Sequence, residues 1–172
     1  MASDEAALYL QATTMAVWTV RGQTPVIRVH PGREKVNFYG TLNLHTRQAH
    51  VTRSATMNAL TTAQHLQTLL DAYPVQPILL LWDRAPWHRG QAIRDVLAAN
   101  PRLEIVELPV AAPDLNPQEQ VWKATRRAVS HHHSHTRLPA LADAFERHLT
   151  TTTFPTSFLA RYDFDHLCAR FK

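Results

Sequence analysis

The pattern of hydrophobic and polar positions changes after about the first fifty residues of the chain. That first part carries short runs of β-branched and aromatic residues, separated by glycine and proline. This arrangement is typical of an antiparallel meander, in which turns join neighbouring strands. The strands that we expect lie at 16–20, 25–29, 35–44 and, as a shorter element, 48–52.

Downstream, apolar residues recur at the spacing of helices. Leucines at this spacing predict a helix at 61–73, with Thr61 or Thr62 as its N-cap. An uninterrupted apolar run at 77–83 then predicts a parallel strand that is buried on both faces. The remaining expected elements are helices at 89–100, 117–129 and 139–149 and a strand at 103–109.

The order of these elements is β-β-β(-β)-α-β-α-β-α-α, so βαβ units extend an antiparallel sheet. It is the order of a ribonuclease H-like fold, an α/β class in which helices flank a mixed sheet, although other α+β folds share parts of it. A chain of 172 residues suits one compact domain of this kind.

Composition narrows the class of protein only slightly. Hydrophobic residues make up 45% of the chain and charged residues 19%, which is ordinary for a globular protein and argues against extensive disorder. The formal net charge of +4 is compatible with a nucleic-acid partner, because cationic side chains neutralise phosphates. Many basic domains bind no anion, so the charge alone does not identify a partner.

The sequence points to a reducing compartment. Cys168 is the single cysteine, so no internal disulfide can form. The first ten residues lack the cationic and apolar regions of a signal peptide, and the aliphatic run at 78–82 is too short to cross a membrane. We therefore expect a cytoplasmic protein with no membrane partner.

Three carboxylates occupy positions that favour chemistry, although each also has an ordinary structural interpretation. Asp83 ends the run at 77–83, where ligand sites of parallel sheets gather, but it could simply cap the following turn. Glu119 follows Asn116 at capping-box spacing, and could instead pair with Lys123. Asp4 lies in an alternating segment typical of a strand, and could be an exposed residue near a frayed terminus.

Taken together, the three acids suit phosphoryl transfer on DNA. This reaction needs metal ions that activate the nucleophile and stabilise the leaving oxygen, typically two ions about 4 Å apart. Magnesium prefers oxygen ligands, so carboxylates from two strands and a facing helix suffice to bind it, with manganese as a substitute.

The local sequences around these acids resemble a known family. The segment SDEAALYL…VWTVRGQTPVI is similar to the D-E…W…R-G-Q-x-P stretch of bacterial insertion-sequence transposases of the mariner-like superfamily. LLLWDRAPWHRG resembles the second block of that family, a strand that ends in Asp with His five residues later. ELPVAAPDLNPQEQVWK resembles the third and most specific block, L-P-x-x-x-P-x-L-N-P-x-E-x-x-W. The three blocks occur in the family's order and span most of the chain.

The resemblance implies a DDE-type transposase of the retroviral integrase and ribonuclease H-like superfamily. Asp4, Asp83 and Glu119 would be its metal-binding, catalytic carboxylates, and 35 residues lie between the last two, as in that family. The implied reaction is metal-dependent DNA cleavage at transposon ends, followed by strand transfer into target DNA. The implied partners are DNA and a second subunit in a homodimer, and the implied location is the bacterial nucleoid.

Two features depart from the family pattern. Three residues precede Asp4, where the family has a longer first strand and, before it, a helix-turn-helix region. We therefore expect residues 1–172 to be a single DDE catalytic domain that lacks this region and part of the first strand. Arg84 stands where many relatives carry Asn, and it could pair with a phosphate or neutralise a carboxylate.

Five basic residues near the acids are candidates for DNA contact. Arg84 and His88 follow Asp83 closely, and His88 could contact the scissile phosphate, orient a carboxylate, or form a structural hydrogen bond. The others follow Glu119 on the predicted helix, where they would contact phosphate or form a solvated face. These are Lys123, Arg126 and Arg127.

Two further features have ordinary interpretations. The histidine-rich stretch at 131–135 is more typical of a solvated loop than of a zinc site, because its ligands lack defined converging spacings. Trp122 is expected in the core rather than as a platform for stacked bases.

Two other functions remain open from the sequence. A truncated remnant could keep the fold and bind DNA non-specifically without catalysis. A nuclease or resolvase of the same fold is a third possibility, against which the third block argues.

Overall fold

A five-stranded mixed sheet forms the centre of the protein in the computed structural model, which describes residues 1–13, 16–26, 33–110, 112–160 and 162–163. The strand order is β3-β2-β1-β4-β5. Strands β1 to β3 are antiparallel, whereas β4 and β5 run parallel to β1, which confirms the expected mixed sheet. The strands are β1 (Ala2–Tyr9), β2 (Lys35–Leu42), β3 (Ala49–Ser54), β4 (Ile78–Trp82) and β5 (Leu103–Glu107).

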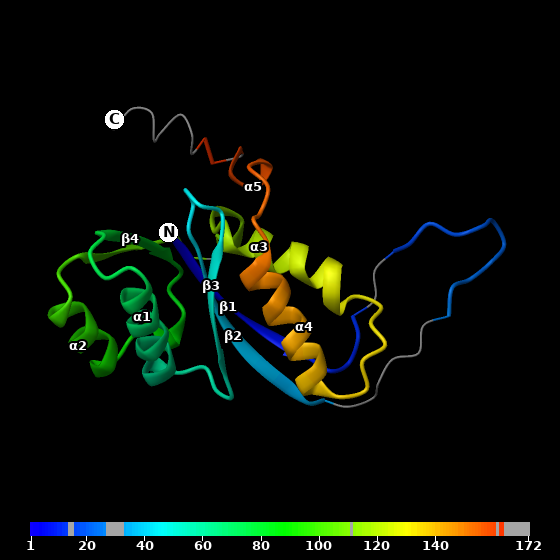
Figure 1. Cartoon of the computed structure of the whole chain (residues 1–172), viewed down its shortest axis with the longest axis horizontal. Coiled ribbons are helices and arrows are strands. Elements are labelled where there is room, and N and C mark those ends of the chain that lie inside the picture. The colour runs from blue at the N-terminus through cyan, green and yellow to red at the C-terminus, as the bar shows by residue number, and fades with distance from the viewer. Residues whose placement is uncertain (14–15, 27–32, 111, 161, 164–172) are drawn as a thin grey trace.

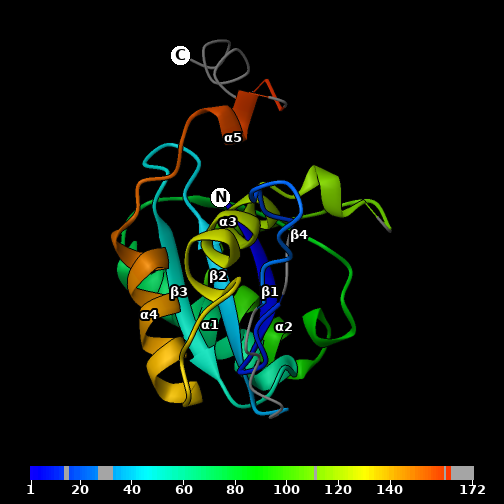
Figure 2. The ribbon, with the colours of Figure 1, turned by 90° about the vertical axis from the view of Figure 1, so that its right-hand side faces the viewer.

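Helices cover the sheet on both faces and give three layers (Figure 1). One face carries α1 and α2, and the other carries α3 and α4, as the view turned by 90° also shows (Figure 2). A π-helical turn at Arg126–Ser130 follows α3. The helices are α1 (Ala59–Ala72), α2 (Gln91–Ala99), α3 (Gln118–Thr125), α4 (Leu138–Thr151) and the short α5 (Ser157–Ala160).

The alternation of side chains along the strands divides the core into two clusters. Ala6 and Leu8 of β1 pack with Trp122 and Phe145 beneath α3 and α4. The cluster on the opposite face joins α1 and α2 to β4 and β5, and includes Leu80. Each fully buried large side chain stabilises the fold by about 1.5–3 kcal/mol, so these clusters fix the positions of the helices.

Gly40 allows α3 to lie close against the sheet. A Cβ atom at this position would lie 2.5 Å from Gln118 Nε2 and 2.5 Å from the Trp122 ring. Gly40 pairs with Asp4 across β1 and β2. The missing side chain therefore brings the start of α3 over the strand that carries Asp4.

The strand expected at 16–20 is wrong. Residues 16–20 form no strand, and Trp18 is fully exposed at 104%. They belong to a segment that projects from the domain (blue, at the right of Figure 1). Strand propensity fails there because no neighbouring surface buries these apolar side chains. Of the strand expected at 25–29, Pro25 and Val26 lie outside any strand and 27–29 fall outside the described residues.

Two smaller expectations also need correction. Asn58, rather than Thr61 or Thr62, caps α1, because its side chain accepts from the N–H groups of Leu60 and Thr61. The run at 77–83 is not buried on both faces, since Leu79 is 53% exposed where α3 and α4 do not extend over β4.

Among the described helices, none combines the length and apolar character needed to span a membrane.

Candidate active site

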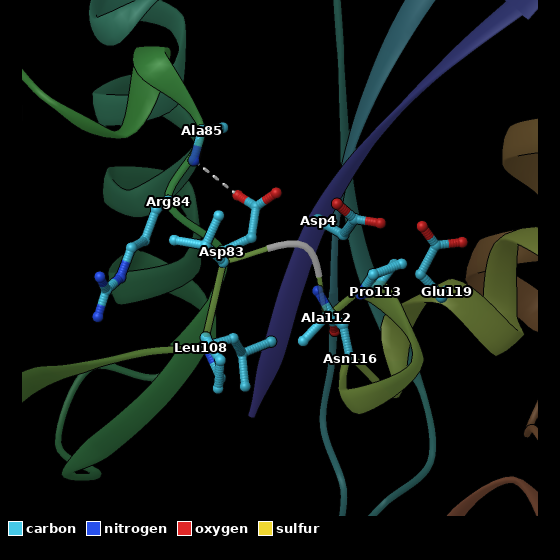
Figure 3. Close-up of a pocket in the computed structure, with 11 residues that line it drawn as sticks. Asp4, Asp83, Arg84, Ala85, Leu108, Ala112, Pro113, Asn116 and Glu119 are labelled. Carbon is cyan, nitrogen blue, oxygen red and sulfur yellow. Dashed lines mark hydrogen bonds between the residues drawn. The ribbon is translucent and has the colours of Figure 1, made fainter.

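Asp4, Asp83 and Glu119 surround one pocket of about 200 Å³ (Figure 3). Asp4 lies within the central strand β1, Asp83 directly follows β4, and Glu119 is in the first turn of α3. The fold thus brings together three residues that are far apart in the sequence. Within the described ranges, no three His, Cys, Asp or Glu side chains converge closely enough to bind one ion in common, so the carboxylates border the pocket rather than meet at a point.

Asp4 is buried close to other acidic side chains. Its carboxylate Oδ2 accepts a hydrogen bond of 3.1 Å from Trp122 Nε1. Burial, followed by the negative charges of Glu119, Glu5 and Asp83, raises the pKa of Asp4 from 3.8 to about 8. A cation in this pocket would offset that repulsion, and oxygen donors of this kind suit Mg²⁺ or Mn²⁺.

Glu119 does not form the capping box that its spacing allows. The Asn116 side chain accepts from the N–H group of Gln118 (3.1 Å) and donates to the carbonyl oxygen of Ser3 (2.8 Å), which ties the start of α3 to β1. The Glu119 side chain points toward Asp4 instead (Figure 3). Across the described part of the chain it has no ion pair, with Lys123 or any other cation.

Asp83 combines a turn-capping role with exposure to the pocket. Its Oδ1 accepts from the N–H group of Ala85 at 3.0 Å and lies 3.1 Å from His88 Nδ1. Half of the side chain, 51%, remains exposed, and no hydrogen bond to Oδ2 is present among the described residues. The capping interaction that the sequence suggested therefore exists and leaves Oδ2 for a ligand.

His88 is a buried part of the site, with only 3% of its side chain exposed. Nδ1 lies 2.8 Å from the carbonyl oxygen of Asp83, and Nε2 lies 2.9 Å from Glu5 Oε1. Beside a carbonyl oxygen and an ionised carboxylate, both of which accept, the ring donates from both nitrogens and is positively charged. Burial alone would lower the pKa of His88, but the hydrogen bond and charge of Glu5, with the backbone and charge of Asp83, raise it. Neither ring nitrogen is left for a phosphate.

Glu5 is a site residue that the sequence reasoning did not single out. Its side chain is only 4% exposed and accepts from both His88 and Trp87 Nε1, the latter at 2.9 Å. The available signal was the D-E pair in the opening segment, in which Glu5 directly follows Asp4.

The basic candidates lie in different settings. Arg84 lines the pocket but its guanidinium points away from the carboxylates (Figure 3) and pairs with Glu107 at 3.0 Å. Arg126 donates to the carbonyl oxygen of Ala7, whereas Lys123 and Arg127 are exposed. Trp122 is 2% exposed, which confirms its expected place in the core.

The histidine-rich stretch serves a local contact. His131 Nδ1 lies 2.7 Å from Thr13 Oγ1, and the two residues form an isolated parallel bridge. This contact joins the segment after β1 to the loop before α4.

Comparison with known proteins identifies the family. Residues 1–142 match the model of the DDE superfamily endonucleases, so the chain belongs to that family. A protein of Shigella sonnei described as the insertion element IS630 uncharacterized 39 kDa protein is 26% identical over 132 residues, which cover 76% of this chain and 38% of that protein.

Solved structures of the Mos1 transposase share the fold. Its paired-end complex with the left transposon end matches with a TM-score of 0.69 and 18% identity, over 93% of this chain and 49% of that chain. The mariner Mos1 paired-end complex with Mg matches with a TM-score of 0.67 and 18% identity, over 93% and 51%. The fold is therefore ribonuclease H-like, as in transposases and integrases, and the chain spans about half or less of the length of these proteins.

Proposed function

We propose that this chain is the catalytic domain of a DDE transposase, which cleaves DNA at transposon ends and transfers the strands to a target. The observation that carries this proposal is the placement of Asp4, Asp83 and Glu119 around one pocket, from three separate elements. Family membership supports the same chemistry, since the matched family consists of endonucleases.

The carboxylates would hold two divalent ions, Mg²⁺ or Mn²⁺. The high pKa of Asp4 and the lack of a cation beside Glu119 among the described residues fit this use, and a Mos1 complex of the same fold contains Mg. Bound ions would supply activation of the attacking hydroxyl and stabilisation of the leaving oxygen. The protein contributes fixed ligands: β1 holds Asp4, the turn after β4 holds Asp83, and α3 holds Glu119.

DNA would approach over α3 and the end of β4. Lys123 and Arg127, which are exposed, and Arg84, which lines the pocket, would contact DNA phosphates. Arg126 supports β1 instead, through its bond to Ala7. A homodimer would allow two transposon ends to be paired, and the protein would act at the bacterial nucleoid in the cytoplasm.

Manganese binding and DNA nicking test the proposal together. Calorimetry with Mn²⁺ should detect binding to the parent chain and its loss in Asp83→Asn, and plasmid nicking in Mn²⁺ should follow the same pattern. Asp95→Asn, an exposed aspartate on α2, is the matched control and should behave like the parent. A parent that binds Mn²⁺ without nicking DNA would favour a catalytically inactive remnant, and absence of binding would contradict the metal site.

A further inference from the structure

Glu5 and His88 form a buried bridge between the two strands that carry Asp4 and Asp83. Neighbouring residues of a strand point to opposite faces, so Glu5 leaves β1 on the face opposite Asp4. There, its Oε1 accepts from His88 and its Oε2 accepts from Trp87, both at 2.9 Å. The side chains of Glu5 and His88 are only 4% and 3% exposed, so solvent does not compete for these bonds.

The other side of the His88 ring fixes the segment that carries Asp83. Nδ1 donates to the carbonyl oxygen of Asp83 at 2.8 Å and lies 3.1 Å from its Oδ1. The ring stacks on Trp82, with centroids 4.3 Å apart and planes within 5°. The imidazole therefore cannot turn without breaking contacts with both strands.

Backbone pairing does not hold these strands together at the level of the carboxylates. Within the described residues, β1 and β4 are paired only at Ala2 and Leu81, and beside this pair Met1 donates to Leu79 and accepts from Leu81. Beyond that point the carbonyl oxygen of Ser3 accepts from Asn116 Nδ2 at 2.8 Å, and the carbonyl oxygen of Asp83 accepts from His88 Nδ1 at 2.8 Å, so neither carbonyl bonds to the neighbouring strand. Asp4 and Asp83 thus lie past the last pair between β1 and β4, and the Glu5–His88 bridge connects their strands there.

We infer that Glu5 and His88 are positioning residues, which set where Asp83 stands relative to Asp4 and thereby the spacing of the metal ligands. The inference rests on the proposed function, in which these aspartates bind divalent ions. Residues that orient metal ligands commonly control affinity, and their loss costs about 10–100-fold. The pair acts through Asp83 and contacts neither metal nor substrate itself.

Two substitutions of Glu5 separate its hydrogen bonds from its charge. Glu5→Met keeps much of the volume but removes both acceptors. Glu5→Gln can keep every bond, because its carbonyl accepts from Trp87 while its amide donates to Nε2 of a neutral His88. We expect calorimetric Mn²⁺ affinity to fall about 10–100-fold in Glu5→Met and to stay within about threefold of the parent in Glu5→Gln.

Thr52→Val is the matched control for loss of a buried hydrogen bond. Thr52 lies in β3, three strands away from β4, and the substitution removes its 2.8 Å bond to His65 of α1. We expect a lower Tm in this variant with unchanged Mn²⁺ affinity. If Glu5→Met fails to unfold cooperatively, Trp87→Phe replaces it, and its Mn²⁺ affinity should fall by a smaller factor because the bond to His88 remains.

The outcomes distinguish this inference from the proposed function. A folded Glu5→Met, or in its place Trp87→Phe, that binds Mn²⁺ like the parent overturns the inference, provided that Asp83→Asn has lost binding. Equal losses in Glu5→Gln and Glu5→Met also overturn it, because the charge rather than the bridge would then matter. A parent that does not bind Mn²⁺ at all overturns the proposed function and the inference with it.

Discussion

Trp122 donates its indole N–H to Asp4 at 3.1 Å and holds the carboxylate against the start of α3. The same ring occupies the space over Gly40, the residue that pairs with Asp4 in the neighbouring strand. A large core residue thus has two functions, because it seats α3 on the sheet and orients an acid of the candidate site. The position of Glu119, on the same helix, depends on the same contact.

We predict that Gly40→Ala destabilises the protein and weakens Mn²⁺ binding. The added Cβ would lie 2.5 Å from both Gln118 and Trp122, so α3 must move away from the sheet. Overpacking of this kind costs about 1–3 kcal/mol, measurable by urea denaturation. At a glycine in open space the same substitution would stabilise the protein, since Ala reduces the conformational entropy of the unfolded chain. Equal or greater stability in Gly40→Ala would therefore contradict the close contact.

We predict that Asp4→Asn stabilises the metal-free protein at pH 8. The pKa of Asp4 rises from 3.8 to about 8 on folding, so its ionised form opposes folding increasingly as the pH rises through this range. The amide removes the charge and still accepts from Trp122. We expect Tm to rise by about 2–4 °C, which corresponds to ~1 kcal/mol for a chain of this size.

Added metal should reverse the order of the Tm values of the parent and Asp4→Asn. Added Mn²⁺ should raise the Tm of the parent and leave Asp4→Asn nearly unchanged, because a ligand stabilises only the state that binds it. Asp95→Asn, which alters an exposed aspartate, should follow the parent in both conditions. A lower Tm for metal-free Asp4→Asn would show that the carboxylate stabilises the fold.

A third prediction concerns acid stability and His65. Its ring lies between Thr41 Oγ1 (2.9 Å) and Thr52 Oγ1 (2.8 Å), and burial, with a smaller contribution from His50, lowers its pKa to about 3. The unfolded chain therefore binds the additional proton between pH 6.5 and 3, so stability is complete above pH 6.5 and falls as the pH is lowered.

The contribution of His65 can be measured as a slope. Each pH unit below 6.5 should cost up to about 1.4 kcal/mol of the free energy of unfolding. Urea denaturation from pH 7 to pH 4.5 measures this slope, and His65→Gln should flatten it whatever its stability at pH 7. An unchanged slope in His65→Gln would assign the acid sensitivity to other groups.

The elements that could be predicted are those that their own sequence pattern indicates. The helix at 61–73 follows from the spacing of its leucines and the strand at 77–83 from its uninterrupted apolar run, and α1 and β4 lie there within a few residues. Segment 16–20 has equally strong strand propensity and forms none, because burial depends on neighbours that the sequence does not specify. The exposed face of Leu79 was missed for the same reason.

The carboxylates of the candidate site could be predicted from the sequence, but the residues that position them could not. Asp4, Asp83 and Glu119 could be chosen because the family blocks mark them, and the fold places them at one pocket. The contact between Glu5 and His88 joins residues 83 positions apart, and no local pattern indicates it. Positioning contacts of this kind arise only when the strands come together.

The last prediction concerns the ion pair between Arg84 and Glu107. The side chains are 45% and 51% exposed and their atoms are 3.0 Å apart, so the pair stabilises the fold by no more than about 1 kcal/mol. A DNA phosphate can displace a partner held this weakly. We predict that Glu107→Gln increases affinity for a short DNA duplex by about 2- to 5-fold, since it frees Arg84 for the phosphate. Fluorescence anisotropy in EDTA measures the effect without cleavage.

A double-mutant cycle separates release of Arg84 from the simple loss of negative charge. In an Arg84→Asn background, Glu107→Gln should change DNA affinity no more than Glu104→Gln does, because Glu104 is an exposed acid of the same strand with no ion pair among the described residues. Arg84→Asn alone should reduce the slope of log DNA affinity against log salt concentration by about 1, the value expected for one lost phosphate contact. If Glu107→Gln strengthens binding equally with and without Arg84, Glu107 acts only by repelling DNA, and Arg84 is not a phosphate contact.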